Sequence, residues 1–282
     1  MKILVTGSKG QLGSEFRALE NSTSHQFTFI DLKTLDLTDV NKVQDYFKQQ
    51  EVDVVINCAA YTAVDQAEDE PDKAFAVNRD AIKNLVGICE IYAIKLIHFS
   101  TDYVFDGKHY KPYNEIDSIN PIGVYGKSKR AGEEVILNSN ISALIIRTSW
   151  LYSIYGHNFV KTMIKLGHEK PELKLIYDQV GSPTNAADLA HLCLQCLDKT
   201  EIWNNQIKIY HFSNEGVASW YDFALAIFEL KNISCQVQPV LSQEFKTKAK
   251  RPHYSVLDKG KIKLDFDIEI DHWKKSLIKS GF

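Results

Sequence analysis

The sequence has few cysteines and no long apolar run. Its five cysteines in 282 residues are scattered and odd in number, so they do not form a disulfide framework. No stretch approaches the roughly 18 apolar residues of a membrane-spanning helix. The first seven residues begin as a strand and lack the charged, apolar and cleavage segments of a signal peptide. We therefore expect a cytoplasmic protein with no membrane partner.

A strong charge of either sign is also missing. The 33 basic and 36 acidic residues leave a formal net charge of −3, which gives no reason to expect nucleic acid as a partner. A dinucleotide or a sugar nucleotide would need only local positive charge. The 44% hydrophobic and 24% charged residues are ordinary for a globular protein, and the length allows one α/β unit with a smaller lobe.

Most motifs for metal binding or nucleophilic catalysis are absent. The sequence contains no H-E-x-x-H, G-x-S-x-G or Walker A pattern, and its nine histidines are scattered. Cys193 and Cys196 form a C-x-x-C pattern within an apolar, helix-like stretch. Because no second cysteine pair or histidine cluster completes a tetrahedral site, we predict two buried structural thiols and no metal ligands.

A glycine-rich turn near the N-terminus is the first positive signal. Residues 2–6 are apolar, as in a buried parallel strand, and Gly7, Gly10 and Gly13 follow before an amphipathic stretch at residues 11–19. Glycines let the backbone approach a pyrophosphate, and a helix N-terminus offers it free N–H groups. This order of strand, turn and helix predicts a dinucleotide-binding site.

The choice between NADPH and NADH stays open. Asp31 lies 18 residues after Gly13, near the spacing expected for a carboxylate that binds the adenosine ribose, which would favour NAD. Lys9 and Lys33 favour the 2′-phosphate of NADP instead. Asp31 equally suits a turn cap, and Asp36 suits either a contact with adenine or a helix cap.

The stretch from residue 99 to residue 133 carries the candidate chemistry. An apolar strand at residues 95–100 brings Ser100 and Thr101 to its carboxyl end, and a helix predicted to start at Asn120-Pro121 carries Tyr125 and Lys129. Their spacing of four places both on one helical face.

These groups are suited to reducing a ketone. A tyrosine, whose pKa is ordinarily about 10, can protonate a developing alkoxide. We expect the Lys129 cation to lower the pKa of Tyr125 and to hold the nicotinamide ribose. Thr101 or Ser100 would stabilise the same oxygen by a hydrogen bond.

The order of elements predicts an α/β protein with a Rossmann-type, doubly wound parallel sheet. Strands and helices alternate through about residue 148, including a strand at 53–57 and one long helix at 71–92. Asn78, midway along that helix, is either a surface residue or a bridge. We predict a dinucleotide-binding core at 1–150, to which later segments return. Residues 151–282 form mainly a smaller, mixed substrate-binding lobe over the carboxyl ends of the strands.

Taken together, the motifs resemble the extended short-chain dehydrogenase/reductase superfamily and, within it, the dTDP-4-dehydrorhamnose reductases. The resemblance covers almost the whole chain. It rests on Gly10-Gln11-Leu12-Gly13, Asn57 to Asp65, Ser100 to Gly107, Val124 to Lys129, Arg147 to Tyr152, Asp178 to Thr184, Arg251-Pro252 and Leu257-Asp258. It implies NADPH- or NADH-dependent reduction of the C4 ketone of dTDP-6-deoxy-L-lyxo-4-hexulose to dTDP-L-rhamnose, for cell-surface polysaccharide biosynthesis, by a monomer or homodimer.

The resemblance also implies roles for individual residues. Thr101, Tyr125 and Lys129 would be catalytic, with Tyr125 as the general acid. The cofactor would contact Gly7, Gly10, Gln11, Leu12, Gly13, Asp36, Leu37, Ala59, Ala60 and Thr62, besides Asp31, Ser100, Tyr125 and Lys129. The substrate would contact Val64, Thr101, Asp102, Tyr103, Phe105, Tyr125, Trp150 and Arg251.

A metal and other functions must also be considered. Some relatives bind Mg²⁺ at a dimer interface through acidic residues, one of which Glu15 matches. Asn185 and two alanines stand where further acidic ligands would be expected, with Asp188 the only acid nearby, so we predict no metal.

Another sugar-nucleotide reductase, an epimerase or a dehydratase could share the fold, but Tyr103 replaces the acid that dehydratases need after Thr-Asp. A non-catalytic regulatory subunit is the remaining alternative, although all three catalytic residues are present.

Overall fold

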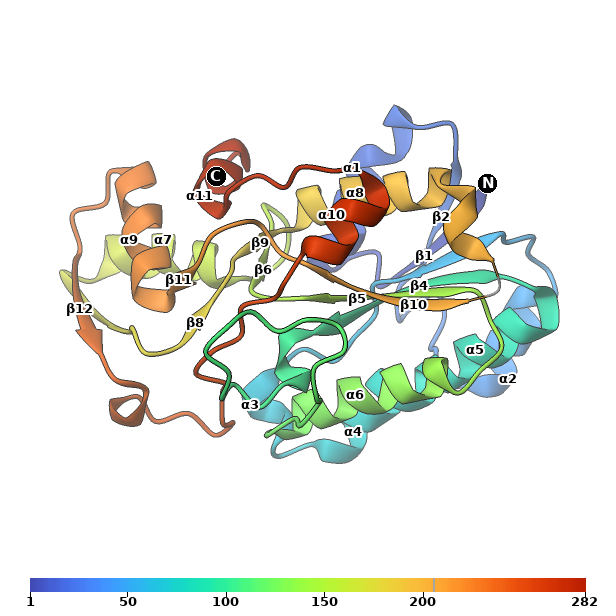
Figure 1. Cartoon of the computed structure of the whole chain (residues 1–282), viewed down its shortest axis with the longest axis horizontal. Coiled ribbons are helices and arrows are strands. Elements are labelled where there is room, and N and C mark those ends of the chain that lie inside the picture. The colour runs from blue at the N-terminus through green and yellow to red at the C-terminus, as the bar shows by residue number, and fades with distance from the viewer. Residues whose placement is uncertain (205) are drawn as a thin grey trace.

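A computed structural model describes residues 1–204 and 206–282, and its centre is a six-stranded parallel sheet (Figure 1). The strand order is β10-β5-β4-β3-β1-β2, and every neighbouring pair is parallel. This confirms the predicted Rossmann-type sheet. The strands are β1 (Lys2–Thr6), β2 (Gln26–Phe29), β3 (Val54–Asn57), β4 (Lys95–Thr101), β5 (Ala143–Thr148) and β10 (Ile207–Phe212).

Helices cover both faces of the sheet because successive strand residues point to opposite sides (Figure 1). Ile3 and Val5 of β1 belong to the apolar cluster beneath α1 (Gln11–Leu19), α8 (Ala186–Asp198) and α10 (Gly260–Phe266). Leu4, between them, belongs to the cluster on the opposite face. There the sheet packs against α2 (Val40–Phe47), α5 (Ala81–Tyr92) and α6 (Val124–Leu137), and α4 (Pro71–Phe75) lies against α6.

The chain beyond residue 150 contributes to both the sheet and a smaller lobe. Two of its segments lie on the core: β10 pairs with β5, and α8 packs against α1. The lobe, which includes α7 and α9 in Figure 1, has its own apolar cluster around Phe223. Its elements are β6 (Leu151–Tyr152), α7 (Phe159–Glu169), β7 (Glu172–Ile176), β8 (Val180–Gly181), β9 (Thr184–Asn185), β11 (Ala218–Ser219), α9 (Trp220–Lys231), β12 (Gln236–Val240) and α11 (Trp273–Lys279). The functional division at residue 150 stays a prediction.

The helix predicted to begin at Asn120-Pro121 begins instead at Val124, so this prediction was wrong. Gly123 is the N-cap residue and, lacking a side chain, makes no capping hydrogen bond. The backbone N–H of Val124 donates to Glu68 Oε1, 2.9 Å away, at the end of the short helix α3 (Val64–Ala67). The start of α6 is therefore fixed by a residue distant in the sequence, which local capping rules do not detect.

The single helix predicted at residues 71–92 is interrupted. A π-helical turn at Ala76–Asp80 separates α4 from α5 and contains Asn78. Asn78 is fully buried; its side chain bonds the backbone of Tyr61 in both directions and donates to Ser128 Oγ. Asn78 is therefore a bridge, joining the loop after β3 to α6. Such π-turns often lie beside functional sites.

Candidate active site

The carboxyl ends of β3, β4 and β5 open into a cleft of about 670 Å³. Ligands bind at this edge in open α/β sheets. The cleft brings together thirteen of the predicted site residues, which come from five separate parts of the sequence. They are Gly10, Gln11, Leu12, Ala60, Thr62, Val64, Ser100, Thr101, Asp102, Tyr103, Tyr125, Lys129 and Trp150.

The glycine turn fits an anionic phosphate group. Gly10 is the N-cap of α1, no side chain caps that helix, and residues 10–12 line the cleft. Gly7 and Gly13 lie behind this turn: Gly7 has a φ of 59°, and a Cβ on Gly13 would lie 2.5 Å from the Gly7 carbonyl oxygen. Ala59 closes the back of the turn, since its backbone N–H donates to Thr6 Oγ1. The free N–H groups and dipole of the helix therefore face the cleft, as pyrophosphate binding requires.

Besides Gly7, Gly13 and Ala59, three more predicted cofactor contacts lie outside the cleft lining. Asp31 caps its own turn by accepting hydrogen bonds from the backbone of Lys33 and Thr34, and it forms an ion pair with Lys9. Asp36 accepts from the backbone and hydroxyl of Thr38, and Leu37 is buried. The carboxylates thus have local capping roles, and their contact with a cofactor stays a prediction. Lys9, one of the two lysines considered for the 2′-phosphate of NADP, lines the cleft.

Lys129 is held beneath the cleft by polar groups of β4. Its Nζ donates to the Phe99 carbonyl oxygen at 2.6 Å and lies 3.4 Å from His98 Nε2. Burial lowers the pKa of Lys129 to about 8, against the opposing effect of the Glu133 carboxylate. The imidazole of His98 is fully buried, and burial lowers its pKa as well.

Tyr125 is a neutral phenol in this environment. Burial raises its pKa to about 12; Asp102 adds to this rise and the Thr101 hydroxyl opposes it. The expectation that Lys129 lowers this pKa was wrong, because the Lys129 ammonium points to Phe99 and burial outweighs the other effects on the phenol. The ring of Tyr125 packs edge-on against Tyr103, with 5.5 Å between centroids. A phenol that keeps its proton at neutral pH can serve as a general acid.

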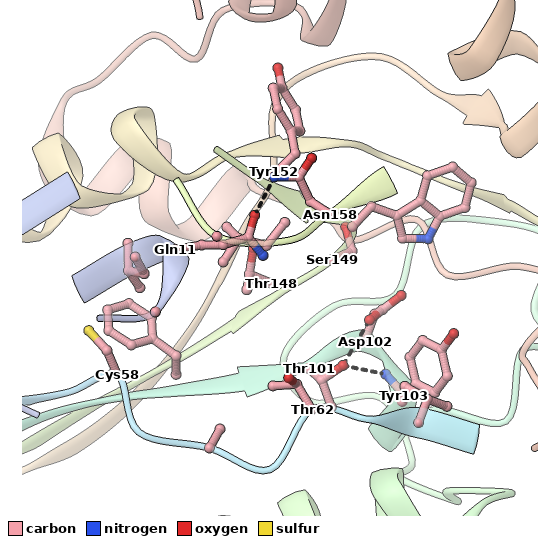
Figure 2. Close-up of a pocket in the computed structure, with 18 of the residues that line it drawn as sticks. Gln11, Cys58, Thr62, Thr101, Asp102, Tyr103, Thr148, Ser149, Tyr152 and Asn158 are labelled. Atoms are coloured by element: carbon pink, nitrogen blue, oxygen red, sulfur yellow. Dashed lines mark hydrogen bonds between the residues drawn. The ribbon is translucent and has the colours of Figure 1, made fainter. Parts of the chain in front are cut away.

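The segment after β4 forms the wall beside Tyr125. Thr101 Oγ1 donates to Asp102 Oδ1 at 2.9 Å and accepts from the Tyr103 backbone at 3.2 Å (Figure 2). Phe105 was predicted to meet the substrate, but it does not line the cleft: its ring is fully buried and stacks on Tyr113.

Arg251 lies outside the cleft lining as well. Its guanidinium pairs with Asp65 and also interacts with the Tyr103 hydroxyl, so it contacts the wall from behind.

The lobe contributes cleft residues that the sequence did not indicate. Trp220 stacks on Trp150 with 3.5 Å between ring centroids. Asn158 Nδ2 donates to Gln11 Oε1 at 3.0 Å (Figure 2). The sequence predicted a lobe over the carboxyl ends of the strands, but it did not indicate which residues of that lobe reach the cleft. The further lining residues are Asn57, Cys58, Phe99, Thr148, Ser149, Leu151, Tyr152, Gly156, His157 and Phe159.

The acidic residues considered as metal ligands are bonded to neutral donors. Glu15 accepts from Ser153 Oγ at 2.6 Å, and Asp188 accepts from Asn214 and Ser276. Within residues 1–204 and 206–282, no three His, Cys, Asp or Glu side chains are grouped as a metal site. Cys193 and Cys196 are buried, which confirms them as structural thiols. In the same described ranges no helix has the length and apolarity to cross a bilayer.

Comparison with known proteins shows the family to which this chain belongs. The family model described as the RmlD substrate binding domain matches residues 1–280. A dTDP-4-dehydrorhamnose reductase from Aggregatibacter actinomycetemcomitans is 38% identical over 98% of this chain and 97% of its own. A spore coat polysaccharide biosynthesis protein, SpsK, from Bacillus subtilis is 39% identical over 98% and 95%.

Solved structures give the same result. A dTDP-4-dehydrorhamnose reductase from Clostridium acetobutylicum has a TM-score of 0.95 and 41% identity, covering 99% of this chain and 98% of its own. The enzyme from Bacillus anthracis, in complex with NADP, has a TM-score of 0.92 and 38% identity over the same shares. The chain therefore belongs to the dTDP-4-dehydrorhamnose reductase family, which is defined by the RmlD substrate binding domain.

Proposed function

We propose that this chain uses NADPH or NADH to reduce the C4 ketone of dTDP-6-deoxy-L-lyxo-4-hexulose, giving dTDP-L-rhamnose, with Tyr125 as the general acid. One observation carries the proposal most directly. A half-buried phenol that keeps its proton lies beside the Thr101 hydroxyl, in one cleft with an uncapped helix N-terminus. The relative from Bacillus anthracis binds NADP.

Residues at one end of the cleft would bind the cofactor, and residues at the other end would protonate the ketone. Residues 10–12 would hold the pyrophosphate, and a reduced nicotinamide, when bound, supplies the hydride for the ketone carbon. As negative charge develops on the ketone oxygen, Tyr125 gives up its proton to that oxygen. Thr101 donates a hydrogen bond to the same oxygen. Lys129, buried one helical turn from Tyr125, would hold the cofactor ribose.

The wall residues would bind the sugar and its nucleotide. Val64, Asp102, Tyr103 and Trp150 line the cleft beside Tyr125 and would contact the substrate. Arg251 would act on a diphosphate only if it exchanged its partner Asp65 for a phosphate oxygen. Tyr103 follows Thr101-Asp102 where a dehydratase would carry an acid, which favours simple reduction over elimination.

A comparison of three substrates tests the proposal. NADPH or NADH oxidation is followed at 340 nm with dTDP-6-deoxy-L-lyxo-4-hexulose, and the product is identified by mass spectrometry and NMR. We expect one dTDP-L-rhamnose per cofactor oxidised. Conversion of dTDP-glucose or UDP-glucose without net oxidation would support a dehydratase or epimerase instead. Absence of turnover with all three, in protein that binds NADPH, would support a regulatory subunit.

A further inference from the structure

The Thr101 hydroxyl has one proton and two possible uses for it. That proton is donated to Asp102 Oδ1, and one lone pair of Oγ1 accepts the Tyr103 backbone N–H (Figure 2). A ketone oxygen in the cleft is an acceptor only, so it competes with Asp102 for the same proton. While Asp102 is a carboxylate, Thr101 can bond the ketone only by giving up a bond to a charged acceptor.

Asp102 is placed to change its protonation state. It lines the cleft with only 2% of its surface exposed, and its second oxygen, Oδ2, has no hydrogen-bond partner of good geometry in residues 1–204 and 206–282. Burial raises the pKa of Asp102 to about 6, and the hydroxyls of Ser255 and Thr101 counteract this rise only in part. A buried carboxylate oxygen without a donor favours the neutral acid.

The other groups around Asp102 do not supply a compensating charge. Tyr103 on the same turn and Tyr125 on α6 are both neutral phenols, and burial raises the pKa of each. Ser255 approaches from the loop before α10. Arg251, on the same loop, pairs with Asp65 and interacts with Tyr103. Asp102 therefore lies in an apolar and neutral environment apart from its hydrogen bonds.

We propose that Asp102 is a positioning residue that controls the Thr101 proton. As a carboxylate it holds that proton, and as an acid it donates its own proton to Thr101 Oγ1 and releases the Thr101 proton to the ketone oxygen. Thr101 then accepts from Asp102 and from the Tyr103 backbone while it donates to the ketone. No covalent bond to hydrogen is broken in this exchange, and the proton that reaches the product still comes from Tyr125. The inference rests on the proposed ketone reduction.

The pH dependence of kcat/KM follows from this arrangement. As the pH rises through 6, Asp102 ionises and the ketone oxygen loses one hydrogen-bond donor. The value of kcat/KM should then fall by about tenfold, which corresponds to the net contribution of one hydrogen bond. An Asp102 that only bound a sugar hydroxyl would act differently, because its carboxylate would be the better acceptor and activity would rise with pH.

Three variants separate these roles. In Asp102→Asn, the amide oxygen can accept from Ser255 while Nδ2 donates permanently to Thr101, so kcat/KM should no longer change between pH 5 and 8, whatever its absolute value. In Thr101→Val, kcat/KM should be lower than in wild type and should no longer fall as the pH rises. In Thr101→Ser, which keeps the hydroxyl, the fall of kcat/KM with pH should remain. A decline that persists in Asp102→Asn, or a rise in KM alone with kcat and the pH profile unchanged, would overturn the proposal.

A titration without substrate distinguishes this inference from the proposed function. The ¹³C carboxyl resonance of Asp102, assigned by its loss in Asp102→Asn, should titrate near pH 6 in the wild type. It should titrate at higher pH in Thr101→Val, which lacks the donor that favours the carboxylate. Titration below pH 4.5 in the wild type would refute the control of Thr101 by Asp102, whatever sugar the enzyme reduces. A midpoint near 6 without ketone reduction would refute the proposed function alone.

Discussion

The buried ion pair between Glu133 and Arg147 gives the sharpest prediction of stability. Both side chains have 0% of their surface exposed. Arg147 Nε donates to Glu133 Oε1 at 2.9 Å, and a second guanidinium nitrogen donates to Oε2 at 2.8 Å. Glu133 lies one helical turn beyond Lys129 on α6, so the pair ties the helix with the catalytic residues to β5.

Replacing Glu133 by Gln leaves the Arg147 cation buried without a counter-charge. His211 cannot supply that counter-charge: burial and Arg147 lower its pKa and keep the imidazole neutral, and its protonated form would add a second positive charge. Breaking one partner of a buried ion pair costs about 3–5 kcal/mol. We expect Glu133→Gln to lower the free energy of unfolding by about that amount, measured by urea unfolding with circular dichroism at pH 7.5.

The next residue offers a matched control. Glu134 is 53% exposed and pairs with Arg130 at 3.0 Å, so Glu134→Gln should cost only about 0–1 kcal/mol. Replacing Glu133 and Arg147 together by Leu and Met should recover most of the loss, since no charge then remains buried. A cost for Glu133→Gln within about 1 kcal/mol of Glu134→Gln would refute the reasoning.

The same pair predicts how stability changes with pH. Burial alone would raise the pKa of Glu133, but the hydrogen bonds and charge of Arg147 outweigh burial and hold it below the ordinary 4.5. A lowered pKa stabilises the folded state above pH 4.5, and this contribution is lost as the pH falls through the lower, folded pKa. Glu133→Gln should therefore differ most from wild type at neutral pH and least in acid.

Further predictions concern α6, α5 and cofactor choice. A Cβ at Gly132 would lie 2.2 Å from the Asn78 carbonyl oxygen, so Gly132→Ala should destabilise by about 1–3 kcal/mol. Gly87 of α5 has nothing within 4 Å of that position, so Gly87→Ala should stabilise by about 0.5–1 kcal/mol, both measured by urea unfolding. A stabilising Gly132→Ala together with a destabilising Gly87→Ala would contradict the described packing. Lys9→Glu should weaken NADPH binding more than NADH binding, by about tenfold for the loss of one charge-assisted hydrogen bond worth about 1.5 kcal/mol, in a fluorescence titration. The exposed Lys42→Glu is the control, and equal loss for both cofactors would exclude a contact between Lys9 and the 2′-phosphate.

Local patterns predicted the sheet and much of the site. Apolar strands followed by Gly7 or by Ser100-Thr101 indicate the carboxyl edge directly, because parallel strands end at one edge of the sheet. The spacing of Tyr125 and Lys129 likewise depends only on helical geometry. These features are set by neighbours in the sequence, which is why the sequence alone was sufficient.

The remaining features depend on contacts between distant segments. Glu68 sets the start of α6 from 56 residues away, and the Asn78 bridge accompanies a π-turn that helix propensity does not predict. Trp220 and Asn158 reach the cleft only because the lobe folds over it. Burial, which determines the pKa of Tyr125, is likewise a property of the assembled protein and not of the Tyr-x-x-x-Lys spacing.

The central claim, that Tyr125 protonates the ketone oxygen, is tested most directly by Tyr125→Phe. The variant removes only the hydroxyl, so kcat for NADPH oxidation with dTDP-6-deoxy-L-lyxo-4-hexulose should fall by about 10²–10⁴-fold, the usual weight of general acid catalysis. The dissociation constant for NADPH, measured by calorimetry on the same preparation, should stay within about threefold of wild type, because less than 1 kcal/mol of binding is lost. Near-wild-type kcat in Tyr125→Phe would contradict the proposed mechanism.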